Sequence, residues 1–184
     1  SSGGWRDYWF PTTYVYHQQP QLIWQKLKSR EHCKKLTRLF GVKNIEEIKM
    51  SIPKVIHYCW FGGNPLPKSA EKCIKSWQKY CPDYEIKRWD ETNFDINCNA
   101  YCKFCYENKK WAFLTDYIRL RVVYDNGGVY LDTDVELLKN LDDLVENGAY
   151  MGFEDEQSIA TGLGFAGEKG HKFIGENMRY YEEL

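Results

Sequence analysis

The sequence has no excess of charge of either sign. Its 25 basic and 26 acidic residues give a net charge of −1, so it lacks the basic surplus that is typical of nucleic-acid-binding domains. It contains no apolar run of the ~18 residues that a membrane-spanning helix needs. It also lacks a charged start followed by an apolar stretch, the pattern of a secretion signal. These absences favour a cytoplasmic protein without a nucleic-acid partner.

Cysteine is present in an odd number. The seven cysteines cannot all pair within one chain, and without a secretion signal we expect most of them to be reduced thiols that pack as small apolar groups. Apolar residues make up 43% of the 184 residues and aromatic residues 16%. That composition can fill one buried core and argues against disorder.

The character of the chain changes near Met50. Residues 1–49 comprise an aromatic, turn-rich stretch and a basic segment over 21–40 that reads as a helix. We interpret them as an N-terminal extension or linker, whose basic helix leaves peripheral membrane association open. Residues 50–184 are interpreted as one domain. We expect it to be incomplete, because its last helix is still running at Leu184.

Strand and helix patterns alternate along residues 50–184. The expected strands cover residues 54–60, 84–89, 129–138, 149–153 and 159–166. The expected helices cover residues 67–80, 100–109, 111–125 and a last segment that begins near 171. This alternation predicts an α/β fold built on a sheet.

The most informative local pattern is a run of alternating carboxylates after Gly127 and Gly128. Successive side chains of an extended strand point to opposite faces, so Asp132, Asp134 and Glu136 are expected to share one face. The first two carboxylates would lie about 7 Å apart and could converge on Mg²⁺ or Mn²⁺, which prefer oxygen ligands. The plain alternative is an edge strand that carries charge to stay soluble.

A second polar feature lies on an apolar helix. Asp116 and Arg119 are three residues apart, so they are neighbours on the helix surface. Apolar residues surround them, which makes a charged pair costly unless it is hydrogen-bonded. Either the two residues form a structural ion pair at the rim, or they form a preorganised site in which arginine binds an anion.

The first strand ends in His57 and Trp60, followed by the Gly62-Gly63 turn. Ligands of open α/β sheets bind at the carboxyl ends of the strands. The flat face of Trp60 could stack on a nucleotide base, a contact worth ~1–3 kcal/mol. Taken alone, both residues are more often structural.

The spacing of Cys98, Cys102 and Cys105 offers a rival hypothesis. It matches the pattern that holds an iron–sulfur cluster in radical S-adenosylmethionine enzymes. In those enzymes the cluster-binding cysteines lie on a loop, whereas residues 101–110 of this chain read as a helix. On a helix the three positions would share one face and pack as small apolar side chains.

Three blocks, taken in order, resemble the sugar transferases that carry an Asp-x-Asp motif. This family (glycosyltransferase family 32) includes bacterial capsular polysaccharide transferases and initiating mannosyltransferases, and the glucosyltransferase domain of large clostridial toxins is similar. The blocks are residues 52–63 with His57 and Trp60, residues 70–97 with Trp77 and Trp89, and residues 112–134 with Asp116, Arg119, Gly127-Gly128, Asp132 and Asp134.

The resemblance implies a GT-A-type, Rossmann-like fold, with a mostly parallel sheet flanked by helices. It implies a retaining transfer from a nucleotide sugar with Mn²⁺ or Mg²⁺ as cofactor. The implied catalytic residues are Asp132, Asp134 and Arg119, and the implied metal ligands are Asp132 and Asp134. The implied donor-binding residues are His57, Cys59, Trp60, Asp116, Arg119, Gly128, Tyr130 and Asp132.

The donor is expected to be a UDP-sugar, with GDP-mannose as second choice. The acceptor is expected to be a glycan, a polysaccharide or a lipid-linked saccharide, as in capsule synthesis. If the chain is eukaryotic with an anchor upstream, the Golgi lumen replaces the cytoplasm. The alternatives are a nucleotide-sugar-binding module without turnover, the iron–sulfur enzyme, and a phosphohydrolase that uses the carboxylates.

Overall fold

The structure is a computed structural model that describes residues 52–152 and 161–183. The proposed extension, residues 1–49, lies outside these residues. The strands are β1 (Val55–Cys59), β2 (Glu85–Trp89), β3 (Gly128–Tyr130), β4 (Tyr150–Met151) and β5 (Phe165–Gly167). The helices are α3 (Lys68–Tyr80), α4 (Ala100–Glu107), α5 (Trp111–Asn126), α6 (Asp142–Val145) and α7 (Lys172–Glu182). None of these helices is long and apolar enough to cross a bilayer.

The described strands form one sheet in the order β2-β1-β3-β5-β4. Strand β1 pairs in parallel with β2 and β3, so that His57 lies opposite Lys87 and Tyr130. Strand β5 is antiparallel to both β3 and β4. Four of the five described strands therefore point the same way, which is the mostly parallel sheet that the sequence predicts.

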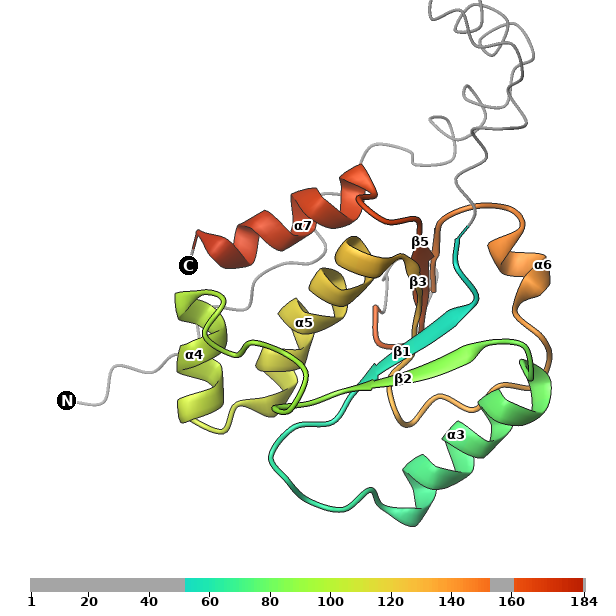
Figure 1. Ribbon diagram of the computed structural model, residues 1–184, viewed down its shortest axis with the longest axis horizontal. Coiled ribbons are helices and arrows are strands. Elements are labelled where there is room, and N and C mark those ends of the chain that lie inside the picture. Colours follow the sequence, from blue (N-terminus) through green and yellow to red (C-terminus); the bar gives the residue numbers. More distant parts are fainter. Residues whose placement is uncertain (1–51, 153–160, 184) are drawn as a thin grey trace, which may run out of the picture. The chain divides into compact units, whose positions relative to one another are not determined.

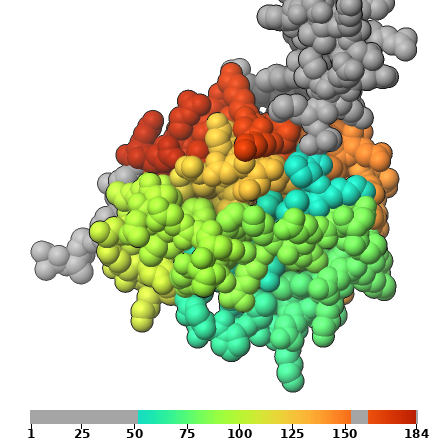
Figure 2. All heavy atoms as spheres, viewed as in Figure 1, coloured from blue at the N-terminus to red at the C-terminus, as the bar shows by residue number. Residues whose placement is uncertain are grey.

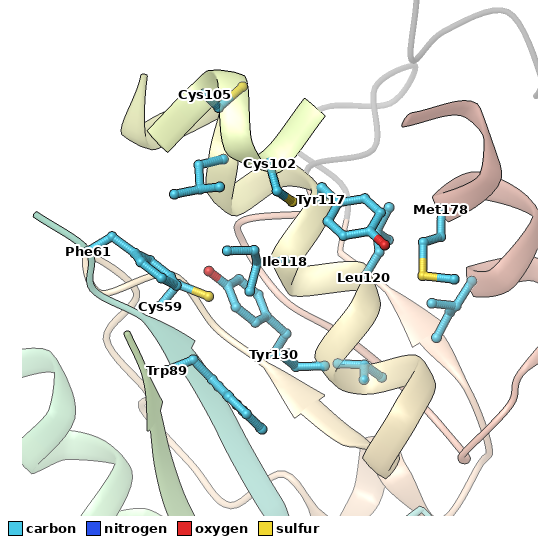
Figure 3. Close-up of a cluster of buried hydrophobic side chains, with 14 of the residues drawn as sticks. Cys59, Phe61, Trp89, Cys102, Cys105, Tyr117, Ile118, Leu120, Tyr130 and Met178 are labelled. Carbon is cyan, nitrogen blue, oxygen red and sulfur yellow. The ribbon is translucent and has the colours of Figure 1, made fainter. Parts of the chain in front are cut away.

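Helices cover both faces of the sheet, with α4, α5 and α7 on one side and α3 and α6 on the other (Figure 1). On the first side, Cys59, Tyr130 and Phe165 pack against helix α5. Figure 3 shows this core, with Ile118 of α5 beside Tyr130 and with Met178 of α7 beyond Tyr117.

The second face of the sheet packs against α3 and the chain after β3. Ile56 and Val129 are fully buried there, and the indole Nε1 of Trp77 donates to the carbonyl of Val135 at 2.8 Å. Alternate residues of β1 and β3 thus supply the two cores, as expected for a strand buried on both faces. The segment from β2 to α4 covers the centre of the face shown in Figure 2.

The glycine pair before β3 is required by packing. Gly127 and Gly128 have φ angles of 70° and 113°, which residues other than glycine rarely adopt. A Cβ atom on Gly128 would lie 2.7 Å from the carbonyl oxygen of Val55 and 2.9 Å from His57 Nε2. The two glycines therefore let the chain pass close to β1 as it leaves helix α5.

Most of the expected elements are confirmed within a residue or two, including β1, β2, α3, α5 and α7. The prediction that residues 129–138 form one extended segment is wrong. Strand β3 ends at Tyr130, and a turn closed by the 3.1 Å hydrogen bond from Val135 N to Asp132 O follows it. Of the last expected strand, residues 159–160 lie outside the described ranges, residues 161–163 form a turn, and β5 begins at Phe165.

Candidate functional site

The centre of the candidate site is a buried arginine. Arg119 lies in the middle of α5, and only 7% of its surface is exposed. Helix α5 runs back along the sheet from the edge at which β1 and β3 end. Arg119 consequently reaches the carboxyl end of β3, where ligands of open α/β sheets bind.

Nearly all donors of Arg119 are used by protein acceptors. Its Nε donates to the carbonyl of Thr115 at 3.1 Å, and its Nη2 lies 3.1 Å from the Asp116 carboxylate. Its Nη1 lies 3.5 Å from Asp132 Oδ2 and donates to the hydroxyl of Thr161 at 3.3 Å. The guanidinium therefore fixes two carboxylates from separate elements in one place, which confirms that Asp116 and Arg119 are neighbours.

Tyr130 also holds the carboxylate of Asp132 in place. Its hydroxyl donates to Asp132 Oδ1 at 2.9 Å, and the Arg119 guanidinium lies 5.3 Å from the centre of its ring. The hydroxyl also faces the sulfur of Cys59 (Figure 3). Burial raises the pKa of Cys59 to about 12, so this thiol is a neutral packing group at ordinary pH.

The chain closes over Asp132 at Gly162. The amide of Asp132 donates to the carbonyl of Gly162 at 3.0 Å, and a Cβ atom on Gly162 would overlap Asp132 Oδ2 and lie 3.1 Å from Arg119 Nη1. Only a residue without a side chain fits this position. The sequence analysis missed Gly162 and Thr161, which lie outside the three blocks that carry the family resemblance.

The second carboxylate of the Asp-x-Asp motif lies in a different environment. Asp134 is exposed, in the turn after Asp132. Among the described residues, no side chain or amide forms a hydrogen bond or ion pair with it. Glu136, expected on the same face, instead binds Lys72 at 2.9 Å. The motif thus presents one carboxylate fixed by the protein and one free carboxylate.

The electrostatics of the site disfavour full ionisation. Burial raises the pKa of Asp116, and the nearby Asp132 raises it further, while Arg119 lowers it. One guanidinium faces two carboxylates, so the cluster carries an excess of negative charge when both are ionised. Titratable groups with such shifted pKa values gather at functional sites.

A family match covers this region. Residues 67–150 match the family described as the glycosyltransferase sugar-binding region containing DXD motif, and Asp132-Thr133-Asp134 supplies the two aspartates. The expected family resemblance is therefore confirmed.

Two curated proteins are similar to this DXD region and its surroundings. One is inositol phosphoceramide mannosyltransferase 3 of Schizosaccharomyces pombe, 31% identical over 134 residues, which covers 70% of this chain and 37% of that protein. The other is an uncharacterized glycosyltransferase, L373, of Acanthamoeba polyphaga mimivirus, 28% identical over 108 residues, which covers 54% and 42%. The chain spans about two fifths of the length of these relatives.

The fold is also shared with a solved structure. The PaToxG glycosyltransferase superposes with a TM-score of 0.57 at 18% identity, over 70% of this chain and 59% of that one. The GT-A-type α/β arrangement that the sequence predicts, with helices on both faces of a mostly parallel sheet, is confirmed.

The DXD region offers a partial set of metal ligands. No group of three histidine, cysteine or acidic side chains converges within residues 52–152 and 161–183. Mg²⁺ is often bound by only one or two carboxylates, together with water and substrate phosphates. Asp134 is free for that use, whereas Asp132 is tied to Tyr130 and Arg119. The residues thus fit a metal that binds together with a phosphate ligand.

The remaining predicted donor contacts fall into two groups. Trp60 follows β1 at the carboxyl edge of the sheet and is partly exposed, with its Nε1 donating to Asn64 O at 2.7 Å. His57 and Gly128 lie in the interior. His57 Nε2 is bonded to Gly127 O at 2.8 Å, and its Nδ1 accepts from Trp89 at 3.1 Å. The structure therefore assigns the His57 ring to the core and leaves Trp60 beside the site.

Two of the three clustered cysteines pack as buried apolar side chains. Asn99 caps α4 by accepting the amide of Cys102 at 2.8 Å. Cys102 and Cys105 are buried on α4, and Cys98 is exposed ahead of the helix. Two buried helical thiols do not form the open loop that an iron–sulfur cluster requires, so the structure favours the packing interpretation.

Proposed function

We propose that the chain carries the donor-binding part of a metal-dependent, retaining glycosyltransferase that moves a sugar from a nucleotide sugar to a glycan, polysaccharide or lipid-linked acceptor. One observation carries the proposal. Arg119 gathers Asp116 and Asp132 at the carboxyl end of β3, and the free carboxylate of Asp134 follows two residues later. The family match over residues 67–150 supports the same site.

The proposed chemistry divides the work between the two aspartates of the motif. Asp132 and Asp116 are held rigidly and would accept hydrogen bonds from hydroxyls of the donor's sugar or ribose. Asp134 would hold Mg²⁺ or Mn²⁺, which neutralises negative charge on the diphosphate as it leaves. The bond from the anomeric carbon to the phosphate oxygen would break, and its electron pair would stay on the leaving diphosphate. The acceptor oxygen would then bond to that carbon and pass its proton to the diphosphate oxygen.

Retention of configuration requires either a nucleophilic side chain or attack on the face that the diphosphate leaves. Asp132 is a poor nucleophile here, because Tyr130, Arg119 and the close approach of Gly162 occupy its oxygens. We therefore favour front-face transfer. A covalent sugar adduct on any side chain, trapped with a slow donor and found by mass spectrometry, would contradict it.

The donor and acceptor classes are proposals as well. A UDP-sugar remains the first choice. GDP-mannose gains support because one relative is by name a mannosyltransferase, and that name also supplies a lipid, inositol phosphoceramide, as an acceptor class to test. Capsule-type polysaccharide synthesis remains the other candidate setting. The cytoplasm remains the proposed location, with the Golgi lumen for a eukaryotic chain.

Calorimetric titration tests the donor site. UDP-sugars and GDP-mannose are titrated into the protein with and without Mn²⁺. We expect one nucleotide class to bind only with Mn²⁺, and Asp134→Ala to abolish this binding without loss of stability, because Asp134 is exposed and unpaired among the described residues. Asp143→Ala removes another exposed carboxylate, on α6, and is the matched control. Metal-dependent binding that survives Asp134→Ala would overturn the metal assignment.

A binding module without turnover is the second candidate. Release of nucleoside diphosphate that depends on added acceptor separates the two functions. Donor binding without such release would support the module.

A further inference from the structure

Two phenylalanines are exposed where α4 ends and α5 begins. The surfaces of Phe104 and Phe113 are 48% and 56% exposed. The ammonium of Lys110 lies between them, 5.5 Å and 5.7 Å from the two ring centres. The rings therefore belong to one surface feature, whereas single exposed apolar residues scattered over a protein would need no explanation.

Three lysines lie near these two rings in the sequence. Lys103, Lys109 and Lys110 are all exposed, and none of them forms an ion pair with a residue in the described ranges. The segment 100–115 contains one acidic residue, Glu107. We call the group formed by Lys103, Phe104, Lys109, Lys110 and Phe113 the α4–α5 patch. It combines exposed apolar rings with an excess of positive charge, three lysines against one glutamate in this segment.

Lys109 occupies a position that suits glycine. Its φ angle of 54° is the one left-handed backbone value among the described residues other than glycine. Glycine usually fills this place just after a helix, because a side chain is strained there. Local backbone geometry therefore does not explain a lysine at position 109. The substitution Lys109→Gly removes its charge and also relieves the backbone strain.

The α4–α5 patch lies at the edge of the sheet that carries the donor site. Trp111, between its two halves, packs on Gly62 just after β1, because a Cβ atom on Gly62 would lie 3.0 Å from the indole ring. Asp116 follows Phe113 by one helical turn. Figure 1 shows the start of α5 at the end of the molecule to which β1 and β2 point.

We propose that the α4–α5 patch docks the protein on an anionic bilayer surface. Basic residues beside exposed aromatic rings are the features with which surface segments bind such membranes. The lysines would meet lipid phosphates while Phe104 and Phe113 enter the boundary below them. A second copy of the chain fits poorly, because pairing two patches would bring six lysines together. A protein or polyanion partner is an outcome of the test.

This docking would turn the donor site toward the membrane. If the proposed transferase function holds, the acceptor that reaches the site is one held in or on the bilayer. The docking itself does not depend on that function, since it uses no residue of the donor site. A failure of the membrane docking can therefore be distinguished from a failure of the proposed transferase function.

Vesicle binding by the full chain tests the charge of the patch. Sedimentation with phosphatidylcholine vesicles, with and without about 30% phosphatidylserine, measures the partition coefficient at low salt. Each lysine near such a surface strengthens binding about fivefold. Lys103→Gln with Lys109→Gly should therefore weaken binding about twenty-five-fold. Lys68→Gln with Lys75→Gln removes two exposed lysines of α3, on the other face of the sheet, and should change it less than about twofold.

The aromatic part is tested by Phe104→Ser with Phe113→Ser, followed by vesicle sedimentation and light scattering. We expect loss of the binding that survives at high salt, with an unchanged molecular mass and unchanged donor binding in calorimetry. Equal binding by the wild type and the lysine variant, or equal binding to neutral and anionic vesicles, would overturn the proposal. A change of mass without a change in vesicle binding would instead identify a protein interface.

Discussion

Replacement of Gly162 by alanine tests the geometry of the site most directly. A Cβ atom at this position overlaps Asp132 Oδ2 and lies 3.1 Å from both Asp132 Cγ and Arg119 Nη1. The backbone cannot easily retreat, because the carbonyl of Gly162 accepts the amide of Asp132 at 3.0 Å. The Asp132 carboxylate is the mobile part and must swing away from Arg119.

The expected cost falls on function more than on stability. The Asp132 side chain is 33% exposed, so it can move toward solvent, and we expect Gly162→Ala to lower the free energy of unfolding by only ~1 kcal/mol, the lower end for overpacking. A shift of about 1 Å in a catalytic or binding group can cost a hundredfold in rate. Donor affinity and turnover should therefore fall by roughly tenfold to a hundredfold.

Gly148→Ala is the matched control. Nothing lies within 4 Å of a Cβ atom there, but its φ angle of 98° strains any side chain. Its stability cost should be similar, ~1 kcal/mol, with no effect on the site. Urea unfolding compares the stabilities, and calorimetry with the nucleotide sugar compares the affinities. If Gly162→Ala binds donor as tightly as Gly148→Ala does, Asp132 is not the contact that we infer.

Two further outcomes follow from the shifted pKa values. Burial and Asp132 raise the pKa of Asp116 in the folded state, so its ionised form costs stability above the pKa of the unfolded chain, and that cost disappears as the pH falls below both values. Asp116→Asn should therefore raise the free energy of unfolding in urea at neutral pH but not near pH 3, and a loss at neutral pH would contradict the sign. A hydrogen bond from Cys102, with help from Arg121, lowers the pKa of the exposed Cys98, whereas burial raises that of Cys59. Iodoacetamide at neutral pH should label Cys98 first, and comparable labelling of Cys59 by mass spectrometry would refute this.

The fold was largely predictable, because most of its helices and strands carry a clear pattern of apolar residues within one continuous segment. Alternating or continuous apolar residues mark β1 and β2, and helical spacing marks α3 and α5. The error at residues 129–138 has a physical cause. Leu131 and Leu137 are buried as an extended strand would require, but the partner strand β5 spans only three residues. Beyond Tyr130 only single backbone hydrogen bonds remain, from Leu131 N to His57 O at 3.1 Å and from Asp132 N to Gly162 O at 3.0 Å, and the bond from Val135 N to Asp132 O then closes a turn.

The arrangement of the candidate site was predictable only in part. Helical spacing alone made Asp116 and Arg119 neighbours, which the 3.1 Å ion pair confirms. The extended model of the motif gave Asp132 and Asp134 equal status. The turn separates them, since one is held by Tyr130 and Arg119 while the other is exposed. That difference underlies the separate roles that we propose for them.

Gly162 shows why the remainder could not be read from the sequence. It stands 30 positions from Asp132 and 43 from Arg119, and a lone glycine between Thr161 and Leu163 is typical of any loop. Its importance comes from the space that its missing side chain leaves for a carboxylate on another element. No periodicity or short motif encodes such an absence. A contact of this kind also restricts the site more than a polar neighbour would, because a polar neighbour can be exchanged for another donor, whereas only glycine leaves Asp132 in place beside Arg119.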